Sequence, residues 1–333
     1  MDKGRRLQKG GYLMNEILTI LPATLRTILT ALPIAVRENL EEIRLRQNQP
    51  LEVRFGQQSS YVTSSGQITS IPAQGWLFSA EEAAKLLNQV SQHSLYALEE
   101  ELKRGYITVV GGHRIGIAGK VVLDKGEVKG IRDVTSFNIR IAREKKGAAK
   151  KVMSYLFEDG KLQNTLLISP PQCGKTTLLR DIARTISYGS EWSSSRKVGI
   201  VDERSELAGC LQGVPQRDVG PRTDVLDACP KAVGMMMLIR SMSPDVLIVD
   251  EVGRAEDGDA VWEAIHAGVA VICSAHGASV KEVAERPMLG KLIRYGAFSR
   301  YIVLSRAKGV GTIQAIYDQS MNLVEREKAA WSS

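Results

Sequence analysis

The segment NTLLISPPQCGKTTLLRDIARTIS, residues 164–187, constrains the fold of this chain more than any other. It begins with an apolar run of strand length, continues through the loop SPPQCGKTT, and then enters a helical pattern. This order of strand, loop and helix is typical of a phosphate-binding loop, because successive backbone N–H groups and the helix N-terminus face a bound anion. We therefore predict a P-loop nucleotide-binding protein with a parallel α/β core, and ATP and Mg²⁺ as its ligands.

The loop residues differ in their expected chemistry. Gly174 lets the backbone approach the phosphates, and Lys175 reaches the β- and γ-phosphates. The Thr176 hydroxyl is expected to bind Mg²⁺. Ser169 and Gln172 depart from the usual pattern, since many such loops have glycine at these two positions, and the loop alone also fits a turn of similar sequence. The residues expected to contact nucleotide are Ser169, Pro170, Pro171, Gln172, Cys173, Gly174, Lys175, Thr176, Thr177 and Asp250.

A second motif, MSPDVLIVDEVGR, has a buried apolar run that ends in Asp250 and Glu251. Carboxylates at such a strand end form a Walker B arrangement, in which Asp250 holds the Mg²⁺ shell together with Thr176. Glu251 is then the candidate general base that takes a proton from the attacking water. The alternative is that the Asp-Glu pair only caps the following helix.

Two further strand ends carry polar residues. VGIVDERSELAG ends in Asp202, Glu203 and Arg204, which could position water, Mg²⁺ or the γ-phosphate, or could form a solvated turn. After VAVICSA comes His276, which is placed to sense the γ-phosphate or has a structural role. The candidate catalytic residues are therefore Glu251, Lys175, Glu203, His276 and Arg204.

Other arginines and histidines are less specific. An ATPase often uses an arginine to stabilise transition-state charge, from the same or a neighbouring subunit. Besides Arg204, the candidates are Arg222, Arg240, Arg254, Arg132, Arg140 and Arg143. We expect structural roles for His93, His113 and His266, and a core position for the run Met235–Met237.

The patterning divides the chain near residue 150. From 151 to 333, the apolar runs TLLIS, VGIVD, VLIVD, VAVICSA and YIVLS alternate with helices or glycine-rich loops, as in a parallel sheet covered on both faces. Residues 1–150 predict a smaller α+β domain. Its expected elements are a hairpin around Asn48–Pro50, a strand at 60–62, a Ser79-capped helix to Gly105, and strands on both sides of Gly111–Gly112.

Composition excludes several classes. With 333 residues, 44% hydrophobic and 24% charged, the chain suits two packed domains, and its 5% aromatic content argues against base stacking. The formal charge of +7 is mild for this length. Four dispersed cysteines and four histidines give no metal-ligand spacing and favour a reducing cytoplasm. The apolar N-terminal stretch is interrupted by Pro22, Arg26 and Pro33, which predicts an amphipathic helical hairpin and no membrane span.

At the level of whole motifs, the chain resembles the stage III sporulation AA family of endospore-forming bacteria. The stretches that carry this resemblance are VDERSELAGC, VPQRDVGPRTDVLDACPKA, MMMLIRSMSPDVLIVDEVGR, GHRIGIAGKVV and IRDVTSFNIRIARE. The family loop usually has glycine where this chain has Gln172. That family is similar in turn to the motor ATPases of type II and type IV secretion systems. The resemblance implies a RecA-like P-loop ATPase domain behind a smaller N-terminal domain, and a hexameric ring.

The resemblance also assigns motifs. VDERSE is similar to the acidic box of the secretion motors and VICSAHG to their histidine box. Since the motors usually have their catalytic glutamate in the acidic box, the general base is open between Glu251 and Glu203, and we favour Glu251. In the motors, N-terminal arginines close over the nucleotide, which would bring in Arg132, Arg140 or Arg143.

The biological role that the resemblance implies is an ATPase in the mother-cell cytoplasm, held at the membrane by partner proteins of the channel between mother cell and forespore. Two alternatives stay open. The basic charge allows a nucleic-acid-binding ATPase, although the scarcity of aromatic residues makes nucleic acid an unlikely partner. Gln172 allows a nucleotide-binding scaffold with little turnover.

Overall fold

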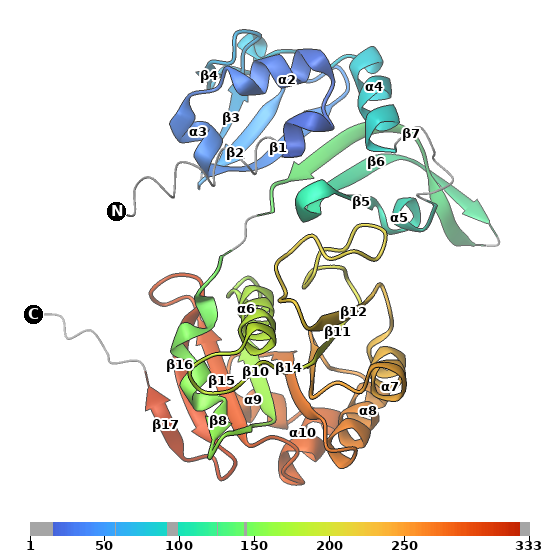
Figure 1. The fold of residues 1–333 in the computed structure, drawn as a ribbon. Helices are drawn as coiled ribbons and strands as arrows, with labels where there is room; N and C mark the ends of the chain where they lie inside the picture. The colour runs from blue at the N-terminus through green and yellow to red at the C-terminus, as the bar shows by residue number, and fades with distance from the viewer. Residues whose placement is uncertain (1–15, 57, 92–98, 125, 143–144, 327–333) are drawn as a thin grey trace, which may run out of the picture. The chain divides into compact units, whose positions relative to one another are not determined.

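The computed structural model describes residues 16–56, 58–91, 99–124, 126–142 and 145–326. The chain forms two compact units, Met1–Arg143 and Glu144–Ser333, called here the N-terminal and C-terminal units (Figure 1). A domain is defined by its capacity to fold alone. The division into units reflects contacts within the folded chain and does not test independent folding, so the domain boundary at residue 150 stays a prediction.

The N-terminal unit is an antiparallel sheet with the strand order β4-β3-β2-β1-β7-β6-β5. Its strands are β1 Leu40–Arg46, β2 Glu52–Phe55, β3 Gln58–Val62, β4 Ile68–Thr69, β5 Tyr106–Val109, β6 His113–Asp124 and β7 Glu127–Arg140. Its helices include α2 Ala23–Thr30, α3 Ile34–Asn39, α4 Ala80–Val90 and α5 Glu99–Arg104, and it has short 3-10 turns at Pro72–Gln74 and Val110–Gly112. An apolar cluster fills the described part of this unit, and it includes Leu25 and Leu29 of α2 together with Ile43 and Ile139 of the sheet.

The predicted elements of this unit recur with one difference. The hairpin around Asn48–Pro50 is β1 paired with β2, and Gly111 lies between β5 and β6 with a left-handed φ of 76°. The Ser79 hydroxyl caps α4 by accepting the Glu82 N–H at 3.2 Å. The helix predicted to run to Gly105 is instead described as α4 and α5. Residues 92–98 between them, and residues 1–15 of the predicted N-terminal hairpin, lie outside the described residues.

The C-terminal unit is built on one mixed sheet with the order β12-β11-β13-β14-β10-β15-β16-β17. The parallel strands are β10 Thr165–Ser169, β11 Val198–Asp202, β12 Thr223–Asp227, β13 Val246–Val249, β14 Ala270–His276 and β15 Arg300–Ser305; β16 Thr312–Asp318 and β17 Leu323–Arg326 add an antiparallel edge. The helices are α6 Lys175–Tyr188, α7 Lys231–Met242, α8 Ala255–His266, α9 Val280–Ala284 and α10 Pro287–Arg294. Short elements at its start are 3-10 turns Ala148–Lys151 and Met153–Tyr155 and strands β8 Phe157–Glu158 and β9 Lys161–Leu162.

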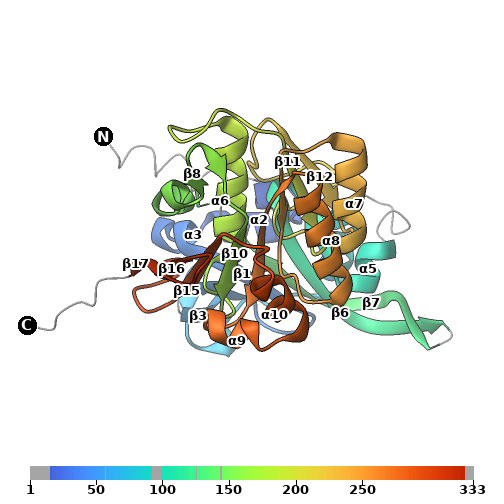
Figure 2. The ribbon, with the colours of Figure 1, turned by 90° about the horizontal axis from the view of Figure 1, so that it is seen from below.

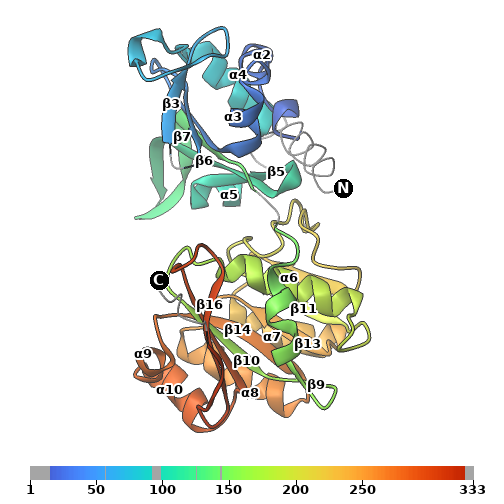
Figure 3. The ribbon, with the colours of Figure 1, turned by 90° about the vertical axis from the view of Figure 1, so that its left-hand side faces the viewer.

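Both faces of this sheet are covered, which explains the continuous apolar runs in the sequence. Leu167 of β10 packs in a cluster with α6, whereas its neighbours Leu166 and Ile168 pack in a second cluster with α7, α8 and α10. Figure 2 and Figure 3 show α6 on one face of the sheet and α7, α8 and α10 on the other. The predicted RecA-like α/β architecture is thus present.

Strand order fixes where the site lies. β14 is inserted between β10 and β13, and β11 is the next strand beyond β13. Because these strands are parallel, the loops that follow all four emerge at one edge of the sheet. The sequence analysis missed β12, whose residues are all half-buried, and the antiparallel strands β16 and β17. The core position expected for the methionine run is wrong for Met237, which is 49% exposed.

No helix in the described part of the chain is long and apolar enough to cross a membrane.

Candidate active site

The phosphate-binding loop connects β10 to α6. Gly174, directly before α6, has a left-handed φ of 88°, and a Cβ placed on it would lie 2.9 Å from Cγ1 of Val310. Glycine is therefore required there by both conformation and space. Gln172 also has a left-handed φ, 58°, which is unfavourable for a side chain with a Cβ. This conformation explains why glycine is usual at the position that Gln172 occupies.

Two side chains at the start of α6 join the loop to the Walker B strand β13. The Lys175 side chain is buried, and its Nζ donates to Oε1 of Glu251 at 2.6 Å and lies 3.7 Å from Oδ1 of Asp250. The Thr176 hydroxyl donates to Oδ2 of Asp250 at 2.9 Å. The residues expected to bind phosphate and Mg²⁺ are thus adjacent, although they are separated by about 75 positions in the sequence.

Ser274 of β14, which the sequence analysis did not single out, organises the Walker B pair. Its buried hydroxyl donates to Oδ1 of Asp250 and accepts the Glu251 N–H at 2.9 Å. These bonds aim the other Asp250 oxygen at Thr176 and hold Glu251 in its left-handed conformation, φ 52°. Ser274 could have been recognised in the sequence as a small polar residue in the otherwise apolar run VICSA. It precedes His276 by two residues and therefore lies on the same side of the strand.

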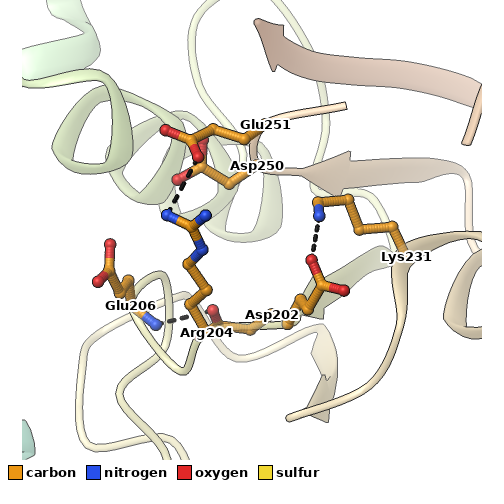
Figure 4. A pocket seen from close by; sticks show the side chains of 7 residues that line it. Asp202, Arg204, Glu206, Lys231, Asp250 and Glu251 are labelled. Carbon is orange, nitrogen blue, oxygen red and sulfur yellow. Dashed lines mark hydrogen bonds and ion pairs between the residues drawn. The ribbon is translucent and has the colours of Figure 1, made fainter. Parts of the chain in front are cut away.

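Glu251 lies between several cations. Partial burial by itself would raise its pKa, but the hydrogen bond from Lys175 and the charges of Lys175, Arg204 and His276 hold the pKa below its usual value. Arg204 Nη1 lies 3.2 Å from Oε2 of Glu251, which is the carboxylate oxygen that Lys175 does not contact. Figure 4 shows the Arg204 side chain extending from the β11 loop toward Glu251. The Glu251 carboxylate is therefore ionised at neutral pH.

The Asp202–Glu203 pair at the end of β11 has a different environment. Asp202 is buried, and its two carboxylate oxygens accept the backbone N–H groups of Glu206 and Ala208, both at 2.8 Å. Burial raises its pKa against the opposing effect of these N–H groups. Asp202 thus closes its own loop, while Glu203 forms an ion pair with Lys231 at the start of α7.

A pocket between the ends of β11 and β13 brings these groups together (Figure 4). It is lined by Asp202, Glu203, Arg204, Glu206, Lys231, Asp250 and Glu251. Lys231 is a further cation that the sequence analysis missed. No short motif marks it, because only the fold brings the start of α7 beside Glu203.

His276 is exposed at the end of β14, in register with Ser169 of β10, and the Gly277 N–H donates to the Ser169 carbonyl oxygen at 3.1 Å. It therefore lies at the end of the strand between β10, which leads into the phosphate loop, and β13, which leads into the Walker B pair. Ser169 and Cys173 are buried, Pro171 and Gln172 are exposed, and Pro170 and Thr177 are half-buried.

The less specific candidates have other contacts or belong to other elements of the chain. Arg222 donates to the backbone and hydroxyl of Ser195, and Arg254 precedes α8 as its N-cap residue. Arg132 and Arg140 are on β7 of the N-terminal unit, and Arg240 is exposed on α7. His113 is buried and accepts the Ala142 N–H, and His266 stacks on Trp262. Arg143 and His93 lie outside the described residues.

The donor chemistry fits magnesium. Mg²⁺ prefers oxygen ligands and is usually bound by one or two protein groups together with substrate phosphates. The Thr176 hydroxyl and the Asp250 carboxylate are such groups, 2.9 Å apart. Across the residues that the structure describes, no group of three or more His, Cys, Asp or Glu could hold a metal ion. The site therefore suits a magnesium ion shared with bound phosphates.

Comparison with known proteins identifies the family. The family model for "Sporulation stage III, protein AA" matches residues 13–324. The chain belongs to this family. It is 52% identical over 313 residues to stage III sporulation protein AA of Bacillus subtilis (strain 168), which covers 94% of this chain and 98% of that protein. The family resemblance predicted from the motifs is thereby confirmed.

Solved structures confirm the predicted fold class. The Legionella pneumophila ATPase DotB matches with a TM-score of 0.53 at 18% identity, covering 80% of this chain and 72% of DotB. The pilus retraction motor PilT, solved with bound ADP, matches with a TM-score of 0.55 at 16% identity, covering 81% of this chain and 75% of PilT. The sporulation family member thus has the fold of secretion motor ATPases.

Proposed function

We propose that this family member is a Mg²⁺-dependent ATPase. The observation that carries the proposal is the double connection between the phosphate loop and the Walker B pair, Thr176 to Asp250 and Lys175 to Glu251. It joins phosphate-binding and metal-binding groups to an ionised carboxylate within one site. The fold shared with DotB and PilT, and the ADP in the PilT structure, also support a nucleotide ligand.

The residues divide the work of phosphoryl transfer to water. The backbone of the loop and Lys175 hold the phosphate chain. To reach the phosphate oxygens, Lys175 gives up its contact with Glu251. Bound Mg²⁺ would neutralise charge on the phosphates, with Thr176 and Asp250 as its protein ligands. Release from Lys175 leaves the Glu251 carboxylate available to accept the proton of the attacking water. In this proposal Arg204 and His276, both of which act electrostatically on Glu251, stabilise charge on the transferred phosphoryl group.

Glu251 is a better candidate for the general base than Glu203. Glu203 is engaged by Lys231, whose side chain is only 12% exposed, and its neighbour Asp202 is committed to the loop backbone. Glu251 instead neighbours the Thr176–Asp250 pair that would hold the metal. We assign the water-activating role to Glu251 on this basis.

The family suggests where the activity is used. We propose that ATP hydrolysis in the mother-cell cytoplasm powers assembly of, or transport through, the channel between mother cell and forespore. In this proposal the chain forms a homo-oligomeric ring, with six subunits as in the secretion motors, and docks at the membrane through channel proteins. The motif resemblance and the shared motor fold support this role.

The test is the Lys175→Ala variant, with Lys281→Ala on the exposed surface of α9 as the matched control. The variant should lose at least about 100-fold in ATP turnover, since an interaction realised with the transferred phosphates supplies several kcal/mol. Phosphate release and thermal unfolding are measured in parallel. A folded Lys175→Ala protein with the turnover of the control would refute the ATPase mechanism. A parent that binds ATP without turnover would favour a nucleotide-binding scaffold.

A further inference from the structure

The turn between β15 and β16, residues 306–311, lies against the phosphate-binding loop at three successive positions. Arg306 Nη1 donates to the side-chain Oε1 of Gln172 at 3.4 Å. The Gly311 N–H donates to the Cys173 carbonyl oxygen at 2.9 Å. The side chain of Val310 approaches Gly174 so closely that a Cβ there would lie 2.9 Å from Val310 Cγ1. The turn is therefore part of the wall of the phosphate site.

This turn is on the opposite side of the loop from the catalytic groups. β10, which leads into the loop, pairs with β14 on one side and with β15 on the other. The β14 side carries Ser274 and His276 and continues to β13, with Asp250 and Glu251. The β15 side carries the 306–311 turn. The phosphate loop thus has an acidic, catalytic side and a second side that the proposed mechanism does not use.

The direction of a bound nucleotide follows from the loop chemistry. The lysine of a phosphate loop reaches the β- and γ-phosphates, and the hydroxyl after it shares the metal with them. Since Lys175 and Thr176 both contact the Walker B pair, the γ-phosphate end faces β13 and β14. The nucleoside end is then expected away from β13 and β14, on the side of the loop that the 306–311 turn contacts.

The turn has side chains suited to a nucleoside. Arg306 is exposed, and a planar guanidinium stacks on aromatic rings and donates several hydrogen bonds in its plane. Val310 is apolar and 50% exposed, so it offers contact area to a base or ribose. The shape of the turn is fixed by Gly309 and Gly311, with left-handed φ values of 108° and 84°, and by the Thr312 hydroxyl, which donates to the Gly309 carbonyl oxygen at 2.7 Å.

We propose that the 306–311 turn forms the nucleoside half of the nucleotide site. Arg306 and Val310 contact the base and ribose of ATP, and the Gln172 side chain is the positioning group that holds Arg306 beside the loop. This inference rests on the proposed nucleotide-binding function and deepens it. It also gives a role to Gln172, where the family usually has glycine.

The experiment compares two ligands, MgATP and inorganic tripolyphosphate with Mg²⁺, by calorimetric titration. Both ligands offer three phosphates, but tripolyphosphate has no nucleoside. Arg306→Ala should weaken ATP binding about tenfold, as expected for the loss of one good contact, and Val310→Ser should weaken it several-fold. Neither variant should change tripolyphosphate binding. Gln172→Ala should weaken ATP binding less than Arg306→Ala, and the double variant should be no weaker than Arg306→Ala.

Two controls separate this inference from the proposed function. Lys175→Ala should weaken both ligands, because it acts on the phosphates. Lys291→Ala, an exposed cation on α10, should weaken neither. The nucleoside assignment is overturned if Arg306→Ala and Val310→Ser bind ATP like the parent, or if they lose ATP and tripolyphosphate equally. A parent that binds neither ligand refutes the phosphate site itself and both proposals with it.

Discussion

The C-terminal unit contains two Asp-Glu pairs that look equivalent in the sequence and differ in structure. Asp202–Glu203 lies at the end of β11, where Asp202 is the last residue of the strand, and Asp250–Glu251 follows β13, the adjacent parallel strand. Both strands are fully buried. Asp250 directs its oxygens outward to Thr176 and Ser274, on other strands or helices. Asp202 directs its oxygens back to the N–H groups of its own loop.

The glutamates differ in the same sense. Glu251 shares a hydrogen bond with Lys175, the lysine of the phosphate loop, whereas Glu203 pairs with Lys231 at the start of α7. The cation that each glutamate contacts therefore separates Glu251, the proposed base, from Glu203, which is held at the start of α7.

The largest expected effect comes from removing the base. Glu251→Gln keeps the shape of the side chain but cannot accept a proton, so ATP turnover should fall by about 10²- to 10⁴-fold with nucleotide affinity retained. Glu203→Gln should cost roughly tenfold at most, which corresponds to about 1.4 kcal/mol, because Glu203 is paired with Lys231 and does not contact the phosphate-loop lysine. Turnover and nucleotide affinity are measured for both variants.

The opposite result would reverse the comparison. If Glu203→Gln abolished turnover while Glu251→Gln kept it, the acidic box would contain the base, as in the usual assignment for secretion motors. Equal losses in both variants would mean that the two glutamates act on the same water.

An intermediate effect is expected on stability. Asp202→Ala leaves the Glu206 and Ala208 N–H groups without their acceptor, and a buried unsatisfied donor costs about 1–3 kcal/mol. We expect the free energy of unfolding to fall by about 2 kcal/mol. Asp250→Ala should change it less, because it removes the acceptor of two side-chain hydroxyls, on Thr176 and Ser274, which can rotate to other acceptors as fixed backbone N–H groups cannot. Urea unfolding of the two variants without nucleotide measures the difference, and a larger loss for Asp250→Ala would contradict it.

The sequence was sufficient to locate the motifs at their strand ends, but it was not sufficient to predict which side chains contact one another there. The strand-loop-helix order around Gly174 and the apolar runs before Asp202 and Asp250 follow local rules of backbone and burial, so they can be read from short segments. The contacts of Ser274, Lys231 and Arg306 depend on strand order. A sequence does not state that β14 lies between β10 and β13, or that β15 brings its turn to the loop.

The same limit explains the errors in the fold. The helix predicted up to Gly105 had the correct periodicity and the correct Ser79 cap, but periodicity alone did not reveal that α4 ends at Val90. The edge strands were missed because a half-buried strand such as β12 lacks the continuous apolar run of an interior strand. The elements whose ends or burial depend on contacts with other parts of the fold were therefore the least predictable from the sequence.

The smallest expected effect concerns the exposed cation that contacts Glu251. Arg204 is one of the charges that lower the pKa of this carboxylate, and its side chain is 69% exposed, so water and salt screen its effect. Glu251 acts as a base only when ionised, so activity falls as the pH drops through its pKa. In the parent this loss lies below the ordinary glutamate value of 4.5. Arg204→Ala should move the acid limb of kcat/KM to higher pH.

The control for this last variant is Arg294→Ala, an exposed arginine on α10 that should leave the acid limb unchanged. Because the Arg204 contribution is electrostatic, added salt should raise the acid limb of the parent toward that of Arg204→Ala. An acid limb that is identical in the parent and in Arg204→Ala at low salt would show that Arg204 does not act through Glu251. Its place beside the carboxylate would then serve the transferred phosphate instead, and the variant would lower kcat at every pH.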